Sequence, residues 1–350
     1  MKLTRSLILL FALSGFLFAA SGTKFDPLPA PTSGSAITTI KLGNRVLVFS
    51  LMGIGAGKTW DAVSNAGYAS NVSYGKWVEV RAIPGSAGRL GAVVVGLREQ
   101  IFLLGGYVLD SQGGETTVSN VEVYSPIEKR WYRGPDLPTP VSNAVAGVYR
   151  DRYIYVIDGR SKTDATQTVQ VYDTEKEAWL QGTPLPGSAV FGHAGAVVGD
   201  TIIYIDGAHK GAPDEPKYVA SDECWMGKIQ HHDPSKIEWS KLPDHPGTAR
   251  FGIAADGSEK DQKIYFSGGS ENPYDYKGMG YDGKPAEPSP VTFAFNLRAN
   301  KWETISENTP DPSINSGLVV TYDKLMIMGG MQKGQQVTAR VEALPKSKAK

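Results

Sequence analysis

Short runs in which apolar and polar residues alternate recur along the chain after its first 22 residues. One such run, "YIYVIDGRSKT" (153–163), stops at Asp158-Gly159, a dipeptide that favours a tight hairpin turn. No partner strand follows within two residues, because "RSKTDATQ" comes before the next apolar run, "TVQVY". The pattern therefore predicts a strand that ends at a glycine-containing pair and continues into a long loop.

The same phrase occurs five times, at intervals of roughly 50 to 60 residues, which is the signature of a repeat architecture. Each copy is an apolar strand closed by one of the pairs Gly105-Gly106, Asp158-Gly159, Asp206-Gly207, Gly268-Gly269 and Gly329-Gly330. Between consecutive pairs another strand carries a tryptophan, at Trp131, Trp179, Trp239 and Trp302. A Pro-rich connection and a further apolar strand follow each tryptophan, so each repeat is expected to hold four strands.

Four strands per repeat, with a glycine pair after the second and a tryptophan in the fourth, resemble kelch repeats, which form the blades of β-propellers. The resemblance covers nearly the whole chain and implies an all-β, six-bladed propeller over residues 23–345. Five units are expected at 35–80, 87–134, 143–182, 191–242 and 250–305, and the last unit lacks a fourth strand. We expect "KFDPLPAP", residues 24–31, to complete that unit with Phe25 in place of the tryptophan, so that the chain ends close the ring.

Composition agrees with a turn-rich all-β domain, because 40 Gly and 22 Pro accompany 41% hydrophobic residues in a chain of 350. The 36 basic and 36 acidic residues balance, which predicts no nucleic-acid partner and no attraction to an anionic membrane. Cys224 is the only cysteine, so no intrachain disulfide forms.

The first 22 residues resemble a secretory signal peptide, with Lys2 and Arg5 before an apolar run and small residues after it. We expect export to a periplasm or the exterior, without membrane insertion after cleavage. The last five residues, "KSKAK" (346–350), are expected to be a flexible basic tail.

Blade topology places the turns on two faces. The turns between first and second strands, and between third and fourth strands, are short and charged. The other connections are long, and loops of that length are uncommon unless they are functional or disordered. The face with the long loops is therefore the predicted functional face.

Residues just before the innermost strands should line the mouth of the central channel. An alignment on Gly91, Gly147, Gly195, Gly252 and Gly317 places five residues at one equivalent position, namely Arg89, Val145, His193, Arg250 and Asn315. Two interpretations stay open: the arginines only hydrogen-bond neighbouring blades, or two guanidiniums form a pocket for a carboxylate or sugar hydroxyls.

The long loops add polar and aromatic groups typical of carbohydrate sites, where rings stack on sugar faces and polar groups bind hydroxyls. The candidate ligand-binding residues in these loops are Arg160, Lys210, Asn272, Tyr274 and Tyr276. His209 and Glu271 are the candidates for acid and base catalysis. No metal or organic cofactor is expected, and "QHHDP" (230–234) is assigned to the opposite face.

Within the kelch group, the block "FGHAGAVVGDTIIYIDGAHK" and the N-terminal "LPAPTSGSAI" resemble the sialic acid mutarotase (N-acetylneuraminate epimerase) family. That resemblance implies a cofactor-independent sugar isomerase. The family's catalytic glutamate falls on Ala208 here, while its lysine matches Lys210. His209 or Glu271 would then serve as the acid or base. The alternative is a non-catalytic module whose same face binds a glycan or a protein partner.

Overall fold

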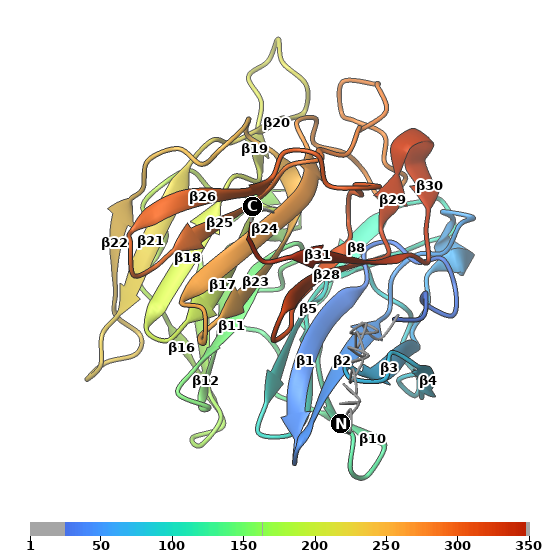
Figure 1. The fold of residues 1–350 in the computed structure, drawn as a ribbon, viewed down its shortest axis with the longest axis vertical. Coiled ribbons are helices and arrows are strands. Elements are labelled where there is room, and N and C mark those ends of the chain that lie inside the picture. Colours follow the sequence, from blue (N-terminus) through green and yellow to red (C-terminus); the bar gives the residue numbers. More distant parts are fainter. Residues whose placement is uncertain (1–24, 163, 348–350) are drawn as a thin grey trace, which may run out of the picture.

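The computed structural model describes residues 25–162 and 164–347. Five four-stranded antiparallel sheets and one three-stranded sheet follow one another along the chain and form blades 1 to 6 of a propeller (Figure 1). Blades 1 to 3 comprise β1 (Ala36–Leu42), β2 (Arg45–Leu51), β3 (Gly67–Asn71) and β4 (Trp77–Val80); β5 (Val93–Leu97), β6 (Gln100–Leu104), β9 (Val121–Ser125) and β10 (Arg130–Arg133); and β11 (Val145–Tyr149), β12 (Tyr153–Ile157), β15 (Val169–Asp173) and β16 (Ala178–Gln181). Blades 4 to 6 comprise β17 (Ala194–Val198), β18 (Thr201–Ile205), β21 (Cys224–Ile229) and β22 (Ile237–Lys241); β23 (Phe251–Ser258), β24 (Lys263–Ser270), β25 (Thr292–Asn296) and β26 (Lys301–Ser306); and β27 (Gly317–Val320), β28 (Lys324–Met328) and β31 (Val341–Pro345).

The first strand of each blade lines the central channel, because β1, β5, β11, β17, β23 and β27 each contact the next one around the ring. This arrangement confirms the predicted all-β, six-bladed fold. Buried residues form layers between neighbouring blades. Val169 and Ile202 belong to the layer between blades 3 and 4, and Phe266 and Phe293 belong to the layer between blades 4 and 5. The core is thus a set of wedges between the blades.

The long connections between second and third strands lie on one face, which is at the top of Figure 1. Four of them form small hairpins: β7 (Tyr107–Leu109) with β8 (Glu115–Thr117), β13 (Arg160–Ser161) with β14 (Asp164–Ala165), β19 (Ala208–Lys210) with β20 (Tyr218–Ala220), and β29 (Met331–Gln332) with β30 (Gln336–Val337). Short 3-10 turns stand beside them at η1 (Trp60–Ala62) and η2 (Lys333–Gln335). These connections are therefore more regular than the loops that the sequence predicts.

Pairs that end the second strands, whether Asp-Gly or Gly-Gly, hydrogen-bond to the next blade. Asp158 is fully buried, and its carboxylate accepts hydrogen bonds from the amide of Gly159 at 2.8 Å and from that of Val190, at the start of blade 4, at 2.9 Å. Gly159 has a φ of 107°, in the region that favours glycine. The amides of Gly106, Gly159 and Gly207 donate to carbonyls of the segments that precede the next blades, and Gly330 in blade 6 donates in the same way to Thr32 at 2.8 Å. The join between the chain ends thus repeats the contact made inside the chain.

Tryptophans of the fourth strands show the same repeat at the outer edge. The indole of Trp131 donates to the carbonyl of Arg81, just after the preceding blade's fourth strand, at 2.8 Å. Trp77 of blade 1 donates in the same way to the carbonyl of Asp26 at 3.0 Å, and the amide of Leu28 donates to Ala339 at 2.7 Å. The N-terminal segment therefore occupies the place that follows a fourth strand in blade 6 and joins this blade to blade 1, although the described sheet of blade 6 has only three strands.

The register of that segment differs from the prediction. Leu28 makes the hydrogen bond that Leu137 and Leu185 make in other blades, six residues after Trp131 and Trp179. Phe25 therefore does not stand at the tryptophan position, and instead packs edge-on against Trp77 with ring centroids 5.4 Å apart. Residues 1–24, with the predicted signal peptide and the first residue of the predicted closing segment, lie outside the described residues. Residues 25–31 of that segment form no β-strand, so the strand predicted there is wrong.

At the other end of the chain, the ammonium of Lys346 binds the carboxylate of Asp261 at 2.5 Å. The first residue of the expected basic tail is thus held on blade 5, and residues 348–350 lie outside the described part. No helix in the described residues is long and apolar enough to cross a membrane.

Candidate functional site

Six residues with left-handed backbone surround the channel mouth on the loop face, one just before or at the start of the first strand of each blade. They are Gly34, Gly91, Asn143, Gly192, Gly252 and Asn315, with φ between 51° and 68°. Hydrogen bonds from amide to carbonyl link them from blade to blade. At 2.8 Å each, Gly252 donates to Gly192, Gly192 to Asn143 and Asn143 to Gly91, while Gly34 donates to Asn315 at 2.9 Å. We call these six residues the mouth ring. Its hydrogen bonds fix the backbone at the top of the channel.

The blade 5 loop, residues 271–291, crosses the mouth ring. Tyr281 packs edge-on against Tyr218 of the blade 4 hairpin at 4.8 Å, and the side chain of Gln335 in blade 6 donates to the carbonyl of Ala286 at 3.4 Å. On the far side, Lys58 of blade 1 donates to the carbonyl of Lys277 at 3.3 Å. The hydroxyl of Tyr276 lies beside Gly113 of the blade 2 hairpin. The loop therefore reaches from blade 5 to the opposite side of the ring and covers the channel.

A cavity of about 170 Å³ lies beneath this loop, and two further cavities of about 200 and 240 Å³ continue along the channel. The upper cavity is called the mouth cavity here. Its polar lining consists of Ser33, Ser35, Tyr107, Asn143, His193, Tyr276, Asn315 and Ser316, together with the mouth-ring glycines. Since one water needs only about 10–15 Å³ of such space, the mouth cavity has room for a small organic ligand.

A small recess adjoins the mouth cavity and shares Tyr107, Asn143 and Tyr276 with it. Arg160 of blade 3 is 7% exposed there and forms an ion pair with Glu115 of blade 2. Its guanidinium lies 5.5 Å from the ring centroids of both Tyr107 and Phe191. Burial raises the pKa of Tyr107 well above its usual value, and Glu115 adds to that effect. The recess is thus a charged pair enclosed by aromatic rings.

His193 lies at the wall of the mouth cavity and is 5% exposed. Its ring packs edge-on against Tyr204 at 5.7 Å, and neither ring nitrogen makes a hydrogen bond of standard geometry with a described residue. Burial lowers the pKa of His193 to about 4, although the backbone of Ile157 acts in the opposite direction. His193 is therefore neutral near pH 7, and the hydroxyl of Ser33, another buried polar group of this lining, is also unpartnered among the described residues.

The structure places five of the predicted ligand-binding residues around the mouth cavity or its recess. They are His193, Asn315, Arg160, Tyr274 and Tyr276. Tyr274 is 3% exposed and its hydroxyl donates to Oδ1 of Asn315 at 3.1 Å, while burial raises the pKa of that phenol. Asn143, Glu115 and Tyr107 also line this region and were missed by the sequence-based prediction.

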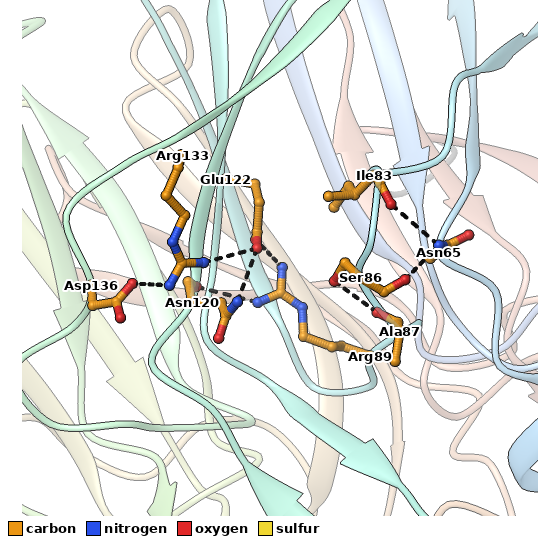
Figure 2. Close-up of polar contacts among 9 residues, drawn as sticks. All are labelled: Asn65, Ile83, Ser86, Ala87, Arg89, Asn120, Glu122, Arg133 and Asp136. Carbon is orange, nitrogen blue, oxygen red and sulfur yellow. Dashed lines mark hydrogen bonds and ion pairs between the residues drawn. The ribbon is translucent and has the colours of Figure 1, made fainter.

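The two arginines expected at the mouth are elsewhere. Arg89 is 2% exposed, and its guanidinium binds the carboxylate of Glu122 and the carbonyl of Asn120 in its own blade (Figure 2). Arg250 is 1% exposed and donates to the carbonyl of Gly268 at 2.7 Å. Burial lowers the pKa of both guanidiniums, opposed by nearby carboxylates. The structural interpretation therefore holds for both, with partners in the same blade instead of the neighbouring one, and the predicted pair of guanidiniums at the pocket is wrong.

The predicted acid and base also lie apart from the mouth cavity. His209 is on the blade 4 hairpin, where Nδ1 faces the carbonyl of Lys210 at 3.0 Å, and Lys210 is exposed. Glu271 is exposed and accepts a hydrogen bond from Thr248 at 2.7 Å. The side chain of Asn272 donates to Asp282 at 2.6 Å within the blade 5 loop. None of these four residues lines the mouth cavity or its recess, so the predicted convergence of His209 and Glu271 on the pocket is wrong.

Comparisons with known proteins agree with the repeat and the fold. Residues 88–138 match the kelch motif. The chain is a six-bladed β-propeller with a kelch motif in its second blade. The Kelch-like protein terF of Aspergillus terreus (strain NIH 2624 / FGSC A1156) is 31% identical over 121 residues, which are 33% of this propeller and 24% of that protein. The solved structure of YjhT superposes with a TM-score of 0.71 and 16% identity over 91% of this chain and 96% of that chain, a likeness that concerns the fold alone.

Proposed function

We propose that this kelch propeller binds a small sugar in the mouth cavity. The observation that carries the proposal is a partly open cavity at the channel mouth whose lining combines tyrosine rings with hydroxyl and amide groups. Sugars are bound in such sites because rings cover their apolar faces while polar groups hydrogen-bond their hydroxyls. The unpartnered Ser33 hydroxyl and His193 nitrogens are supporting features, since buried polar groups normally have partners.

Mutarotation is the second candidate function, and the Glu115 carboxylate favours it. The reaction needs one group to protonate the ring oxygen and another to remove the anomeric hydroxyl proton, after which the ring opens and closes again as the other anomer. Glu115 lies in the recess beside the hydroxyl-bearing rings of Tyr107 and Tyr281. In this proposal Glu115 takes the role that the sequence assigned to His209 or Glu271. The resemblance to sialic acid mutarotases supports the same reaction type.

Saturation-transfer NMR with purified protein and freshly dissolved monosaccharides tests both candidates in one sample. Binding is expected as transferred saturation, and mutarotation as anomer exchange faster than in buffer. Glu115→Gln should slow exchange by roughly 100-fold or more, the lower end of the range for a lost acid or base, and should leave binding in place. Glu271→Gln on the same face is the matched control and should change neither. Binding with buffer-level exchange would leave a sugar-binding module, and no binding by any sugar would contradict the proposed function.

We also propose that residues 1–22 direct export of the propeller. The apolar run and the small residues after it support this proposal. N-terminal sequencing of the protein recovered from the periplasm or the medium should give a start near Ser21. A protein retained in the cytoplasm with its N-terminal methionine would contradict export.

A further inference from the structure

We infer that the ligand of the mouth cavity is an uncharged, hydroxyl-rich molecule held between the side chains of Asn143 and Asn315. This inference rests on the proposed sugar-binding function and specifies its substrate class. It excludes the carboxylate-bearing ligand that a pair of arginines at the mouth would favour.

The mouth ring provides its own internal comparison. Its six positions share one backbone conformation, and four of them are glycine, the residue that adopts this conformation without steric cost. The other two are Asn143 in blade 3 and Asn315 in blade 6, three blades apart in a ring of six, and so on opposite sides of the channel. Asparagine tolerates this backbone better than most residues but less well than glycine. Glycine would therefore satisfy the backbone at both positions. The asparagines add two primary amides to opposite sides of the cavity lining, that of Asn143 beside Gly91 and that of Asn315 beside Gly252.

The two amides differ in what they bind. Oδ1 of Asn315 accepts the hydroxyl of Tyr274 at 3.1 Å, which joins this residue to the blade 5 loop above the cavity. Asn143 lines both the mouth cavity and the recess, and its side chain makes no hydrogen bond with another described residue. One amide thus offers its NH₂ group, and the other offers both a donor and an acceptor. Such groups match sugar hydroxyls, which donate and accept at the same atom.

Charge excludes an anionic ligand. Among the described residues that line the mouth cavity there is no Asp, Glu, Lys or Arg, and burial keeps His193 neutral near pH 7. The recess contains one guanidinium, that of Arg160, against two carboxylates, those of Glu115 and Asp275, so its net charge is negative. A buried carboxylate without a cationic partner is strongly disfavoured, and a second negative charge beside the recess adds repulsion.

The test compares neutral and anionic probes on the full-length mature protein. Galactose, glucose and N-acetylglucosamine are the neutral probes, and N-acetylneuraminic acid is the anionic one. Isothermal titration is expected to give at least one neutral sugar a Kd at least tenfold lower than that of N-acetylneuraminic acid. Asn143→Gly should then weaken the bound neutral sugar by about 3- to 10-fold, as expected for the loss of one or two neutral hydrogen bonds. Asn315→Gly should weaken it at least as much, because it also releases Tyr274.

Glycine at either position keeps the left-handed backbone, so Asn143→Gly should melt at the wild-type temperature or above. Asn315→Gly should melt somewhat lower, because it leaves the buried hydroxyl of Tyr274 without its partner. Asn300→Gly is the matched control, because Asn300 has a φ of 49° in the exposed turn between β25 and β26, on the opposite face. It should leave sugar binding unchanged. Unchanged affinity in Asn143→Gly, or binding of N-acetylneuraminic acid as tight as that of the best neutral sugar, would overturn this inference while sparing the proposed function. No binding of any probe to the wild-type protein would overturn both.

Discussion

The buried ion pair of Arg89 and Glu122 illustrates what single residues do in this propeller. Arg89 and Glu122 are 2% and 4% exposed, and Glu122 also binds Arg133, which in turn binds Asp136 (Figure 2). We predict that Arg89→Met lowers the free energy of unfolding by about 3 kcal/mol, because it leaves a buried carboxylate with one half-exposed partner. Chemical denaturation checks the size of the loss.

Sugar affinity separates this structural role from a role in the site. Arg89→Met should leave the Kd for a neutral sugar unchanged in the folded protein, since Arg89 does not line the mouth cavity. Arg133→Ala is the control for stability, because that guanidinium is 49% exposed and its loss should cost only about 0–1 kcal/mol. An Arg89→Met protein that is as stable as the wild type but has lost affinity for the sugar would contradict the structural role and indicate that Arg89 takes part in binding.

The register of the mouth ring explains why the candidate site was only partly predictable. Aligning the repeats on glycine alone gave Gly147, Gly195 and Gly317, which lie inside the innermost strands, whereas the left-handed positions are Asn143, Gly192 and Asn315. The signal that could have corrected the register is that asparagine and glycine both adopt positive φ. Arg89 and Arg250 were aligned correctly with each other, but the direction of a long side chain depends on partners such as Glu122 and Gly268, which alignment does not supply.

At the scale of the strands, Asp256 of β23 joins blade 5 to blade 6. Its carboxylate lines the channel and accepts hydrogen bonds from the amides of Val320 and Gly257, both at 2.8 Å. Burial raises the pKa of Asp256 from 3.8 to about 6, although these two amides oppose the rise. Between pH 4 and 6 the folded protein therefore holds a proton at Asp256 that the unfolded chain has released.

This difference predicts the direction of a pH effect. Since the native state binds more protons in that window, the contribution of Asp256 to stability falls as pH rises from 4 to 6 and is constant above about 7. The loss amounts to about 1–3 kcal/mol, because one pKa unit corresponds to about 1.4 kcal/mol. Denaturation curves of the wild type and Asp256→Asn, recorded from pH 4 to 8, isolate this term as their difference. A difference that is flat with pH, or that rises with pH, would contradict the prediction.

The elements themselves were largely predictable, and their packing on the loop face was not. The four-strand period and the glycine pairs predict the blades because they are local patterns, and their strands occur where they were expected, except for the closing strand predicted at residues 24–31. The path of the blade 5 loop depends on contacts between residues far apart in the sequence, such as Lys58 with Lys277 and Gln335 with Ala286. No local pattern encodes such contacts, so the cover over the mouth cavity could not be inferred from sequence.

At the scale of the whole molecule, the closed ring depends on the first described residues. Leu28 is 3% exposed, and the interface between blades 6 and 1 includes Phe25, Val48, Val319 and Met326. Three hydrogen bonds cross this junction within the first eight described residues: Leu28 to Ala339, Thr32 to Thr338 and Gly330 to Thr32. The six blades are therefore stabilised as a ring, and the N-terminal segment is the part of the chain that connects its last blade to its first.

We therefore predict that a chain starting at Pro31 is much less stable than one starting at Ser21. The shorter chain keeps Thr32 and the mouth-ring residue Gly34 but loses Leu28 from the junction and the Asp26 carbonyl from Trp77. The segment before β31 thereby loses its hydrogen bond from Leu28 to Ala339. An open sheet edge is prone to pair with other chains, so aggregation on heating is expected together with a lower melting temperature. Thermal melts followed by circular dichroism, with light scattering for aggregation, compare the two chains. A synthetic peptide of residues 21–35, added in excess, should restore part of the lost stability, because it supplies the missing contacts in trans. If the shorter chain melts within a degree or two of the longer one and stays monomeric, the N-terminal segment does not close the ring.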